Sequence, residues 1–409
     1  MSDLLGIFLK EFLRAPRTFL RHGSEARRRP DREECEAVLR EQEQRAAAEL
    51  QRAFVLHRRE AGTVNGASAS AEVRPADDSN LVQRIIDAYV KALVVDGGPG
   101  DSQWAVFLEQ LNMPVHKALT SGDVDLVSQK LRNPSTNNIF YGFDNIREDY
   151  TRQWKEDSDA RDFFTRQIYD ALARLAEALG AIPLENPETY GFRDPQPYPV
   201  DDLLSRLDEA LGIFVTFPNP YPDECGLATE RGTASFRAIQ SLYQAWRITQ
   251  VLDEHGGTSV VEIGAGLGRT AYYAAKLGVK RYSIVDLPFT LMSSAYFLGR
   301  VLGDAGVALF GEERAGRWLD LTIPSDFLDR DEPVDLVVNF DSFTEIDRAM
   351  ADRYWNHVFD VSSVFLSMNH EANPFTVRDF YQVTPGRYRV SRHPCWMRRG
   401  YVEELIELW

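Results

Sequence analysis

The segment VEIGAGLGRTAYYAAKLG carries the residues best suited to hold a ligand. A short β-branched run comes first, then a glycine-rich turn, and then a helical pattern. Such a turn lets a ligand approach the backbone, and the helix that follows offers free N–H groups. The glycines are Gly264, Gly266 and Gly268, which gives GxGxG, and Arg269 stands where the dinucleotide fingerprint GxGxxG needs its last glycine. The spacing therefore favours a nucleoside over a pyrophosphate.

An acidic residue follows at a separation suited to a ribose. Asp286 ends the next strand-like run, about 20 residues after the glycine turn, where a carboxylate can accept hydrogen bonds from both ribose hydroxyls. The two features together predict a nucleoside-containing cofactor. The alternative is a structural strand-to-helix turn in another class of α/β domain.

Four further side chains can do acid–base chemistry. Asp341 and Glu345 follow the fourth strand-like run, and His370 and Glu371 follow the fifth. Parallel sheets place their ligands at the carboxyl ends of the strands, so these groups can remove a proton from an acceptor. The alternative is that they hold a divalent ion that lowers the pKa of a hydroxyl. No fixed ligand spacing supports this, and no metal is predicted.

The elements that must position these residues are strands alternating with helices. The strand-like runs are SVVEI (259–263), RYSIVD (281–286), WLDLTI (318–323), VDLVVNF (334–340) and VSSVFLSMN (361–369). This alternation predicts an α/β fold, a mainly parallel, Rossmann-like sheet with helices on both faces. The tail can add an antiparallel hairpin at the sheet edge.

The chain before this domain is predicted to be mostly helical. We expect basic amphipathic and charged helices over 1–60, a linker or loop over 61–79, and a helical cap that shapes the acceptor pocket over 80–230. The α/β domain then covers 231–409. The loop NPSTNNIFYGFDN (133–145) suits either sugar stacking or a contact between domains.

Composition limits the partners. The 409 residues carry a net charge of −16, so nucleic acid is not expected as a general partner. Three scattered cysteines and the lack of a long apolar run favour a cytoplasmic protein. Residues 1–30 are basic and amphipathic. They can lie on a membrane surface, or dock on the chain's own domain or on a second subunit of a homo-oligomer.

At this point the sequence resembles the S-adenosylmethionine-dependent class I methyltransferases. Their first motif is an acidic residue followed by GxGxG, here Glu262 to Gly268. Over residues 210–375 the chain resembles the family of sugar O-methyltransferases more closely. The segments that carry this resemblance are TERG before the first strand, IVDLP after the second, and Asn339, Ser342, Glu345 and Ile346 after the fourth; Ile346 replaces the methionine typical of the family.

The resemblance implies S-adenosylmethionine as cofactor and methyl transfer to a hydroxyl of a sugar or glycoconjugate, assisted by a general base. The base would be His370, Glu345 or Asp341. Arg231 would pair with the carboxylate of the cofactor, or else form an ordinary ion pair with a neighbouring acid. The implied cofactor-binding residues are Glu262, Gly264, Ala265, Gly266, Gly268, Asp286, Leu287, Asn339 and Arg231.

Three other functions stay open. Fold and cofactor do not determine the acceptor, so a non-sugar small molecule is one alternative. A non-catalytic scaffold that keeps the fold is another. A nicotinamide-dependent oxidoreductase is the third, and the GxGxG spacing disfavours it.

Overall fold

The computed structural model describes residues 66–68, 77–96, 106–184, 197–384, 386 and 388–408. All of them belong to one unit of the chain, Arg59–Trp409. The basic and charged helices predicted for 1–60, and with them the membrane or subunit contact proposed for 1–30, lie outside the described residues.

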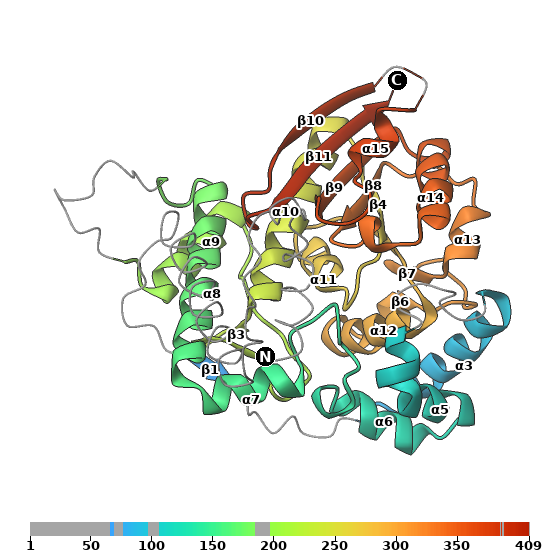
Figure 1. Ribbon diagram of the computed structural model, residues 1–409, viewed down its shortest axis with the longest axis horizontal. Helices are drawn as coiled ribbons and strands as arrows, with labels where there is room; N and C mark the ends of the chain where they lie inside the picture. The colour runs from blue at the N-terminus through green and yellow to red at the C-terminus, as the bar shows by residue number, and fades with distance from the viewer. Residues whose placement is uncertain are drawn as a thin grey trace, which may run out of the picture. The chain divides into compact units, whose positions relative to one another are not determined.

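A mainly parallel sheet of eight strands forms the C-terminal half (Figure 1). In spatial order its strands are β10 (Tyr388–Pro394), β11 (Tyr401–Leu408), β9 (Val364–His370), β8 (Leu336–Phe340), β4 (Ser259–Ile263), β5 (Arg281–Val285), β7 (Leu319–Thr322) and β6 (Val307–Ala308). Among these described strands only β11 runs opposite to the rest of the sheet, because it pairs antiparallel with both β9 and β10. The predicted hairpin at the sheet edge is confirmed.

The strand order places a ligand crevice at β4. From β4 the chain crosses to β5 on one side, and β8 later joins β4 on the other side. At such a switch point the loops after the two strands diverge and leave a crevice at their carboxyl ends. The glycine turn after β4 and the acidic residues after β8 therefore meet at one edge of the sheet.

Helices cover both faces because the strands are apolar on both. Val260 and Val338 pack into one core with α10 (Phe236–His255), α11 (Arg269–Lys276) and α12 (Pro288–Leu302). Val261 and Val337 pack into a second core with α13 (Pro324–Leu328), α14 (Arg348–Val361) and α15 (Arg378–Tyr381). The predicted α/β fold, with a mainly parallel Rossmann-like sheet and helices on both faces, is confirmed.

The region before the sheet is mostly helical, as expected. Its described α-helices are α3 (Ser79–Asp96), α5 (Met113–Ser121), α6 (Val124–Arg132), α7 (Glu148–Glu156), α8 (Ser158–Ala178) and α9 (Val200–Leu211). Helix α3 packs on α12, and α8 packs on α10. Buried Asp78 strengthens the first contact, because it pairs with Arg132 of α6 and with Arg300 of α12, 3.5 Å away.

A small antiparallel sheet was not predicted. Strand β1 (Gly66–Ser68) pairs with β2 (Cys225–Thr229), and β2 pairs with β3 (Gly232–Ala234). Part of the expected linker over 61–79 is therefore a strand. Its three small residues carry no β-branched or aromatic signal, so only the pairing with β2 makes this segment extended.

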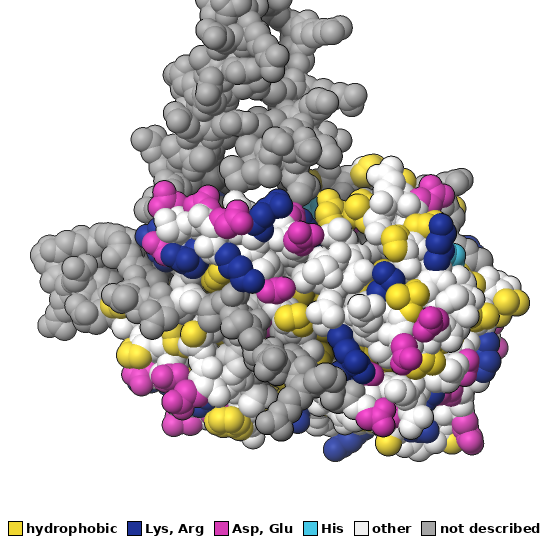
Figure 2. Space-filling model, turned by 90° about the horizontal axis from the view of Figure 1, so that it is seen from below, with side chains coloured by type: hydrophobic (Ala, Val, Ile, Leu, Met, Phe, Trp, Pro, Cys, Tyr) yellow, Lys and Arg dark blue, Asp and Glu magenta, His cyan; other side chains and the backbone are white. Residues whose placement is uncertain are grey.

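No helix in the described part of the chain is long and apolar enough to cross a bilayer. Basic and acidic side chains are interspersed over the described part of the face shown in Figure 2.

Candidate functional site

A cavity of about 540 Å³ opens at the carboxyl ends of β4, β5 and β8. This volume lies within the range of about 300–1,000 Å³ that small-molecule sites occupy. Its lining follows the strand order of the sheet: Asp341 and Glu345 come after β8, the glycine turn after β4, Asp286 after β5 and Pro324 after β7. The cavity therefore brings a ligand on the glycine turn close to the acid–base residues Asp341 and Glu345.

The glycine turn requires its glycines. Gly264, Gly266 and Gly268 all have a left-handed backbone, with φ of 73°, 58° and 82°. A Cβ atom on Gly264 would lie 2.0 Å from Ser342 Oγ, and one on Gly268 would lie 2.7 Å from Leu298 Cδ1. No side chain fits there, so the turn keeps the backbone open to a ligand on its outer side. Gly264, Gly266 and the intervening Ala265 border the cavity, whereas Gly268 packs inward.

Asp286 is held at the rim of this turn. Its carboxylate accepts hydrogen bonds from the backbone N–H of Gly266 at 3.1 Å and of Leu287 at 2.8 Å. The side chain is half-buried and borders the cavity. Burial raises the pKa of Asp286 to about 7, although these backbone hydrogen bonds oppose the shift. A ligand hydroxyl that donates to this carboxylate would restore the lost solvation.

Glu262 lies next to Asp286 in a more buried position. Tyr282 donates a hydrogen bond to its carboxylate at 2.9 Å, and burial raises the pKa of Glu262 to about 8. It borders the cavity together with Leu287. Two acids that share a dry pocket favour a ligand that offers hydrogen-bond donors.

Besides Gly268, two further predicted cofactor residues do not border the cavity. The Asn339 amide donates to Ile263 O at 2.8 Å and to Ser342 Oγ at 2.6 Å, so it ties the end of β8 to the end of β4. Arg231 lies in the turn between β2 and β3, where it pairs with Asp208 at 2.6 Å and stacks on Phe214. The structure thus gives Arg231 an ordinary ion pair with a neighbouring acid.

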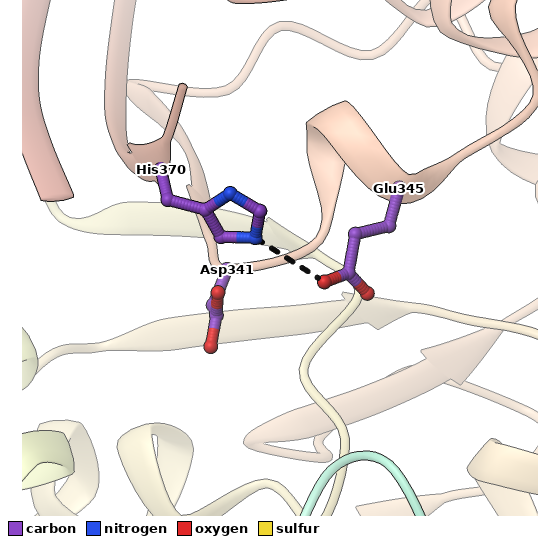
Figure 3. A group of neighbouring side chains, drawn as sticks. All are labelled: Asp341, Glu345 and His370. Atoms are coloured by element: carbon purple, nitrogen blue, oxygen red, sulfur yellow. Dashed lines mark ion pairs between the residues drawn. The ribbon is translucent and has the colours of Figure 1, made fainter. Parts of the chain in front are cut away.

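The three candidate bases lie together (Figure 3). One ligand atom from each of Asp341, Glu345 and His370 lies within 4.8 Å of the others. Figure 3 shows His370 and Glu345 pointing toward each other, with His370 Nε2 3.7 Å from Glu345 Oε1. Glu371, by contrast, pairs with Arg392 at 2.7 Å. The structure therefore brings together three of the four acid–base residues named from the sequence.

The charges around this cluster separate the roles of its members. Burial alone would raise the pKa of Asp341, but the guanidinium groups of Arg398 and Arg237 outweigh this and hold its pKa below the ordinary value. The neighbouring Glu345 carboxylate raises the pKa of His370. Asp341 is thus a neutralised anion, while Glu345 and His370 form a dyad that can share a proton.

The hydrogen bond that His370 accepts makes Glu345 the better proton acceptor of the pair. His370 Nδ1 accepts the backbone N–H of Ala372 at 3.3 Å, so the neutral ring carries its proton on Nε2, facing Glu345. Glu345 borders the cavity, and it is the group that can receive a proton from a ligand. A divalent ion on the same three residues would need an Nε2 lone pair, which this hydrogen bond opposes.

Sequence reasoning missed two groups that border the cavity. One is a polar stripe on α10, formed by Arg237, Gln240, Ser241 and Gln244. The other is Gly142, Phe143 and Asp144, in the loop before α7. The spacing i, i+3, i+4, i+7 of polar residues on an otherwise buried helix was the available signal for the stripe. The sequence analysis named the loop 133–145 as a candidate ligand contact, but it did not single out these three residues.

Comparison with known proteins gives matches among solved structures alone. No family model matches the sequence, and no curated protein matches it. One structural match is an S-adenosylmethionine-dependent methyltransferase from Clostridium acetobutylicum, 12% identical, covering 40% of this chain and 90% of its own, with a TM-score of 0.32. Another is the O-methyltransferase TomG from Streptomyces achromogenes, 14% identical, covering 41% and 80%, with a TM-score of 0.30. A third is magnesium protoporphyrin IX methyltransferase from Synechocystis, 11% identical, covering 42% and 83%, with a TM-score of 0.30. The fold assignment rests on the strand order and pairing described above.

Proposed function

We propose that this protein is an S-adenosylmethionine-dependent O-methyltransferase that acts on a hydroxyl of a sugar or glycoconjugate. The observation that carries the proposal is one cavity bordered by the GxGxG turn, by the Asp286 carboxylate and by Glu345. The first two hold a nucleoside, and the third can take a proton from an acceptor. The helical region before the sheet serves as the cap that closes this cavity.

The order of groups along the cavity gives the cofactor a direction. The adenine lies at Tyr354 and Pro324, and the ribose lies at Asp286. The sulfonium then points toward Glu345. This direction places the methyl group beside Glu345, which borders the cavity and whose carboxylate lies 3.7 Å from His370 Nε2.

The transfer itself is a single displacement. The acceptor oxygen attacks the methyl carbon, the carbon–sulfur bond breaks, and S-adenosylhomocysteine leaves. The hydroxyl proton passes to the Glu345 carboxylate, and the Nε2–H of His370 orients that carboxylate by its 3.7 Å contact. A hydroxyl is a poor nucleophile at neutral pH. The protein must therefore align the acceptor oxygen with the methyl group and remove the hydroxyl proton.

The stripe on α10 supports a polyhydroxylated acceptor. Gln240 and Ser241 are more than nine-tenths buried and border the cavity. Gln244 accepts a hydrogen bond from Thr270 at 2.7 Å. Buried amides and hydroxyls need hydrogen-bond partners, and sugar hydroxyls provide both donors and acceptors. An apolar acceptor would offer this stripe no hydrogen bonds.

Binding is the first test. Purified protein is titrated calorimetrically with S-adenosylhomocysteine and, separately, with NAD, and both titrations are repeated on Asp286→Ala. Asp352→Asn is the control, because that aspartate lies in an exposed pair with Arg348. We expect micromolar binding of S-adenosylhomocysteine that is lost only in Asp286→Ala. Binding of NAD alone would instead make the protein an oxidoreductase, and binding of neither would leave the scaffold function.

The acceptor is tested next. Methyl transfer from labelled S-adenosylmethionine is measured over a panel of sugars, glycoconjugates and phenolic small molecules, with and without a chelator. Transfer to sugars that is lost in Glu345→Gln supports the proposal. Transfer only to non-sugar acceptors would overturn the sugar assignment and leave the methyltransferase assignment standing. Loss of activity with the chelator would restore the metal alternative for Asp341, Glu345 and His370.

A further inference from the structure

The loop before α7 meets the glycine turn directly. A Cβ atom placed on Gly266 would lie 3.2 Å from the Cβ of Phe143, so the Phe143 side chain lies over that glycine. Gly142 and Phe143 border the cavity with Gly266 and Asp286. An aromatic side chain from the N-terminal half of the chain thus stands beside the position assigned to the ribose.

A buried ion-pair network fixes this loop. Arg269 Nε lies 2.9 Å from Asp144 Oδ2, and another nitrogen of the same guanidinium lies 2.7 Å from Glu224 Oε1. All three side chains are at most 5% exposed. Breaking a buried pair of this kind leaves an uncompensated charge, so the loop is tied firmly to the first residue of α11.

The same carboxylate also shapes the loop. Asp144 accepts the backbone N–H of Asn145 at 2.8 Å and that of Ile146 at 3.2 Å. Asp144 is therefore bonded on one side to its own turn and on the other to Arg269, 125 residues later in the sequence. Phe143, the residue before it, has little freedom to leave the glycine turn.

We propose that Phe143 is a cofactor-binding residue whose side chain packs on Gly266 and forms a wall of the nucleoside site beside it, and that the Asp144–Arg269–Glu224 network positions it. This inference rests on the proposed function, and it assigns the loop to the cofactor rather than to the acceptor. Arg269, which replaces the last glycine of a dinucleotide fingerprint, then has a role of its own. It joins the cap to the cofactor turn.

The test measures the dissociation constant of S-adenosylhomocysteine by calorimetry, together with the melting temperature of each variant. Phe143→Ala removes the ring, and we expect affinity to fall by about tenfold or more, with partial recovery in Phe143→Leu. Phe214→Ala is the matched control, since Phe214 is an exposed aromatic residue outside the cavity. Affinity of Phe143→Ala equal to that of the unmodified protein would overturn the proposal.

Asp144→Asn tests the positioning network. Its matched control is Asp78→Asn, which removes another buried aspartate that anchors the N-terminal region through two arginines. Both variants should lower the melting temperature, but only Asp144→Asn should weaken S-adenosylhomocysteine binding at a temperature where both are folded. An equal loss of affinity in the two variants would mean that Asp144 acts on stability alone.

The double variant separates positioning from direct contact. If Asp144 acts through Phe143, Phe143→Ala combined with Asp144→Asn should bind no more weakly than Phe143→Ala alone. Additive losses would show that Asp144 does not act through this ring. Failure of the unmodified protein to bind S-adenosylhomocysteine at all would refute the proposed function itself, which is a different outcome from any of these.

Discussion

The strongest prediction concerns the pH dependence of cofactor binding at Asp286. Burial raises the pKa of this carboxyl group to about 7 in the free protein, against the opposing hydrogen bonds from Leu287 and Gly266. The ribose hydroxyls donate to the ionised carboxylate, so the cofactor and the proton compete for the same group. Affinity for S-adenosylhomocysteine should therefore rise as the pH rises through 7 and become constant above it.

The size of the effect follows from the titration. With a pKa of about 7, roughly one-tenth of Asp286 is ionised at pH 6 and nine-tenths at pH 8, so affinity should differ about tenfold between them. Asp286→Asn keeps the shape of the side chain and removes the charge. Each hydrogen bond to a charged group contributes about 1.5–3 kcal/mol, so the loss of one should weaken binding by roughly tenfold to more than a hundredfold.

The assay is calorimetric titration with S-adenosylhomocysteine at pH 6, 7 and 8, in two buffers with different ionisation enthalpies. Proton release on binding should be largest in the unmodified protein near pH 6. Burial also raises the pKa of the neighbouring Glu262, to about 8. Any pH dependence of binding that remains in Asp286→Asn is therefore the contribution of Glu262. Unchanged affinity from pH 6 to 8 in the unmodified protein, or a full slope kept in Asp286→Asn, would refute the reasoning.

Three further predictions concern single residues. The pKa of the His370 imidazole should lie above its ordinary 6.5, because Glu345 stabilises the protonated ring. NMR titration should show a lower pKa of His370 in Glu345→Gln, and an unchanged pKa would contradict the pairing of the two residues. Gly264→Ala should abolish S-adenosylhomocysteine binding, since its Cβ would lie 2.0 Å from Ser342 Oγ, while Gly256→Ala, also left-handed but in open space, should bind normally. Asp78→Asn should lower the free energy of unfolding in urea by about 3 kcal/mol, since it breaks the ion pairs of a buried carboxylate with the partly exposed Arg132 and Arg300; a change below 1 kcal/mol would contradict this.

The fold could be read from the sequence because its signals are local. Runs such as SVVEI and VDLVVNF are apolar on both faces, which is typical of strands in a parallel sheet covered on both sides. The structure places β4 and β8 on these runs. By contrast, β1 has no such signal, and its extended form depends on pairing with β2, which follows more than 150 residues later.

Part of the candidate site could also be read from the sequence. Gly264, Gly266 and Asp286 belong to one strand–turn–helix–strand unit, so their spacing along the chain nearly determines their spacing in the fold. Asp341, Glu345 and His370 come from two neighbouring strands, and the parallel order alone predicted that they would meet. Which of them is best placed to receive a proton in the proposed reaction was not predictable, because this depends on the 3.3 Å hydrogen bond from the Ala372 N–H to His370 Nδ1.

The sequence by itself determined the fold class and the turn that a nucleoside fits, since both depend on residues close together in the chain. Only the tertiary structure decided which polar residues face the cavity. Arg231 was a candidate partner for the carboxylate of the cofactor, but in the structure it pairs with Asp208. Arg269 was noted only because it stands where a dinucleotide fingerprint has its last glycine, and in the structure it pairs with Asp144. A buried arginine needs an acidic partner, and the fold decides which acid lies within reach of its side chain. For Arg269 that acid is 125 residues away along the sequence.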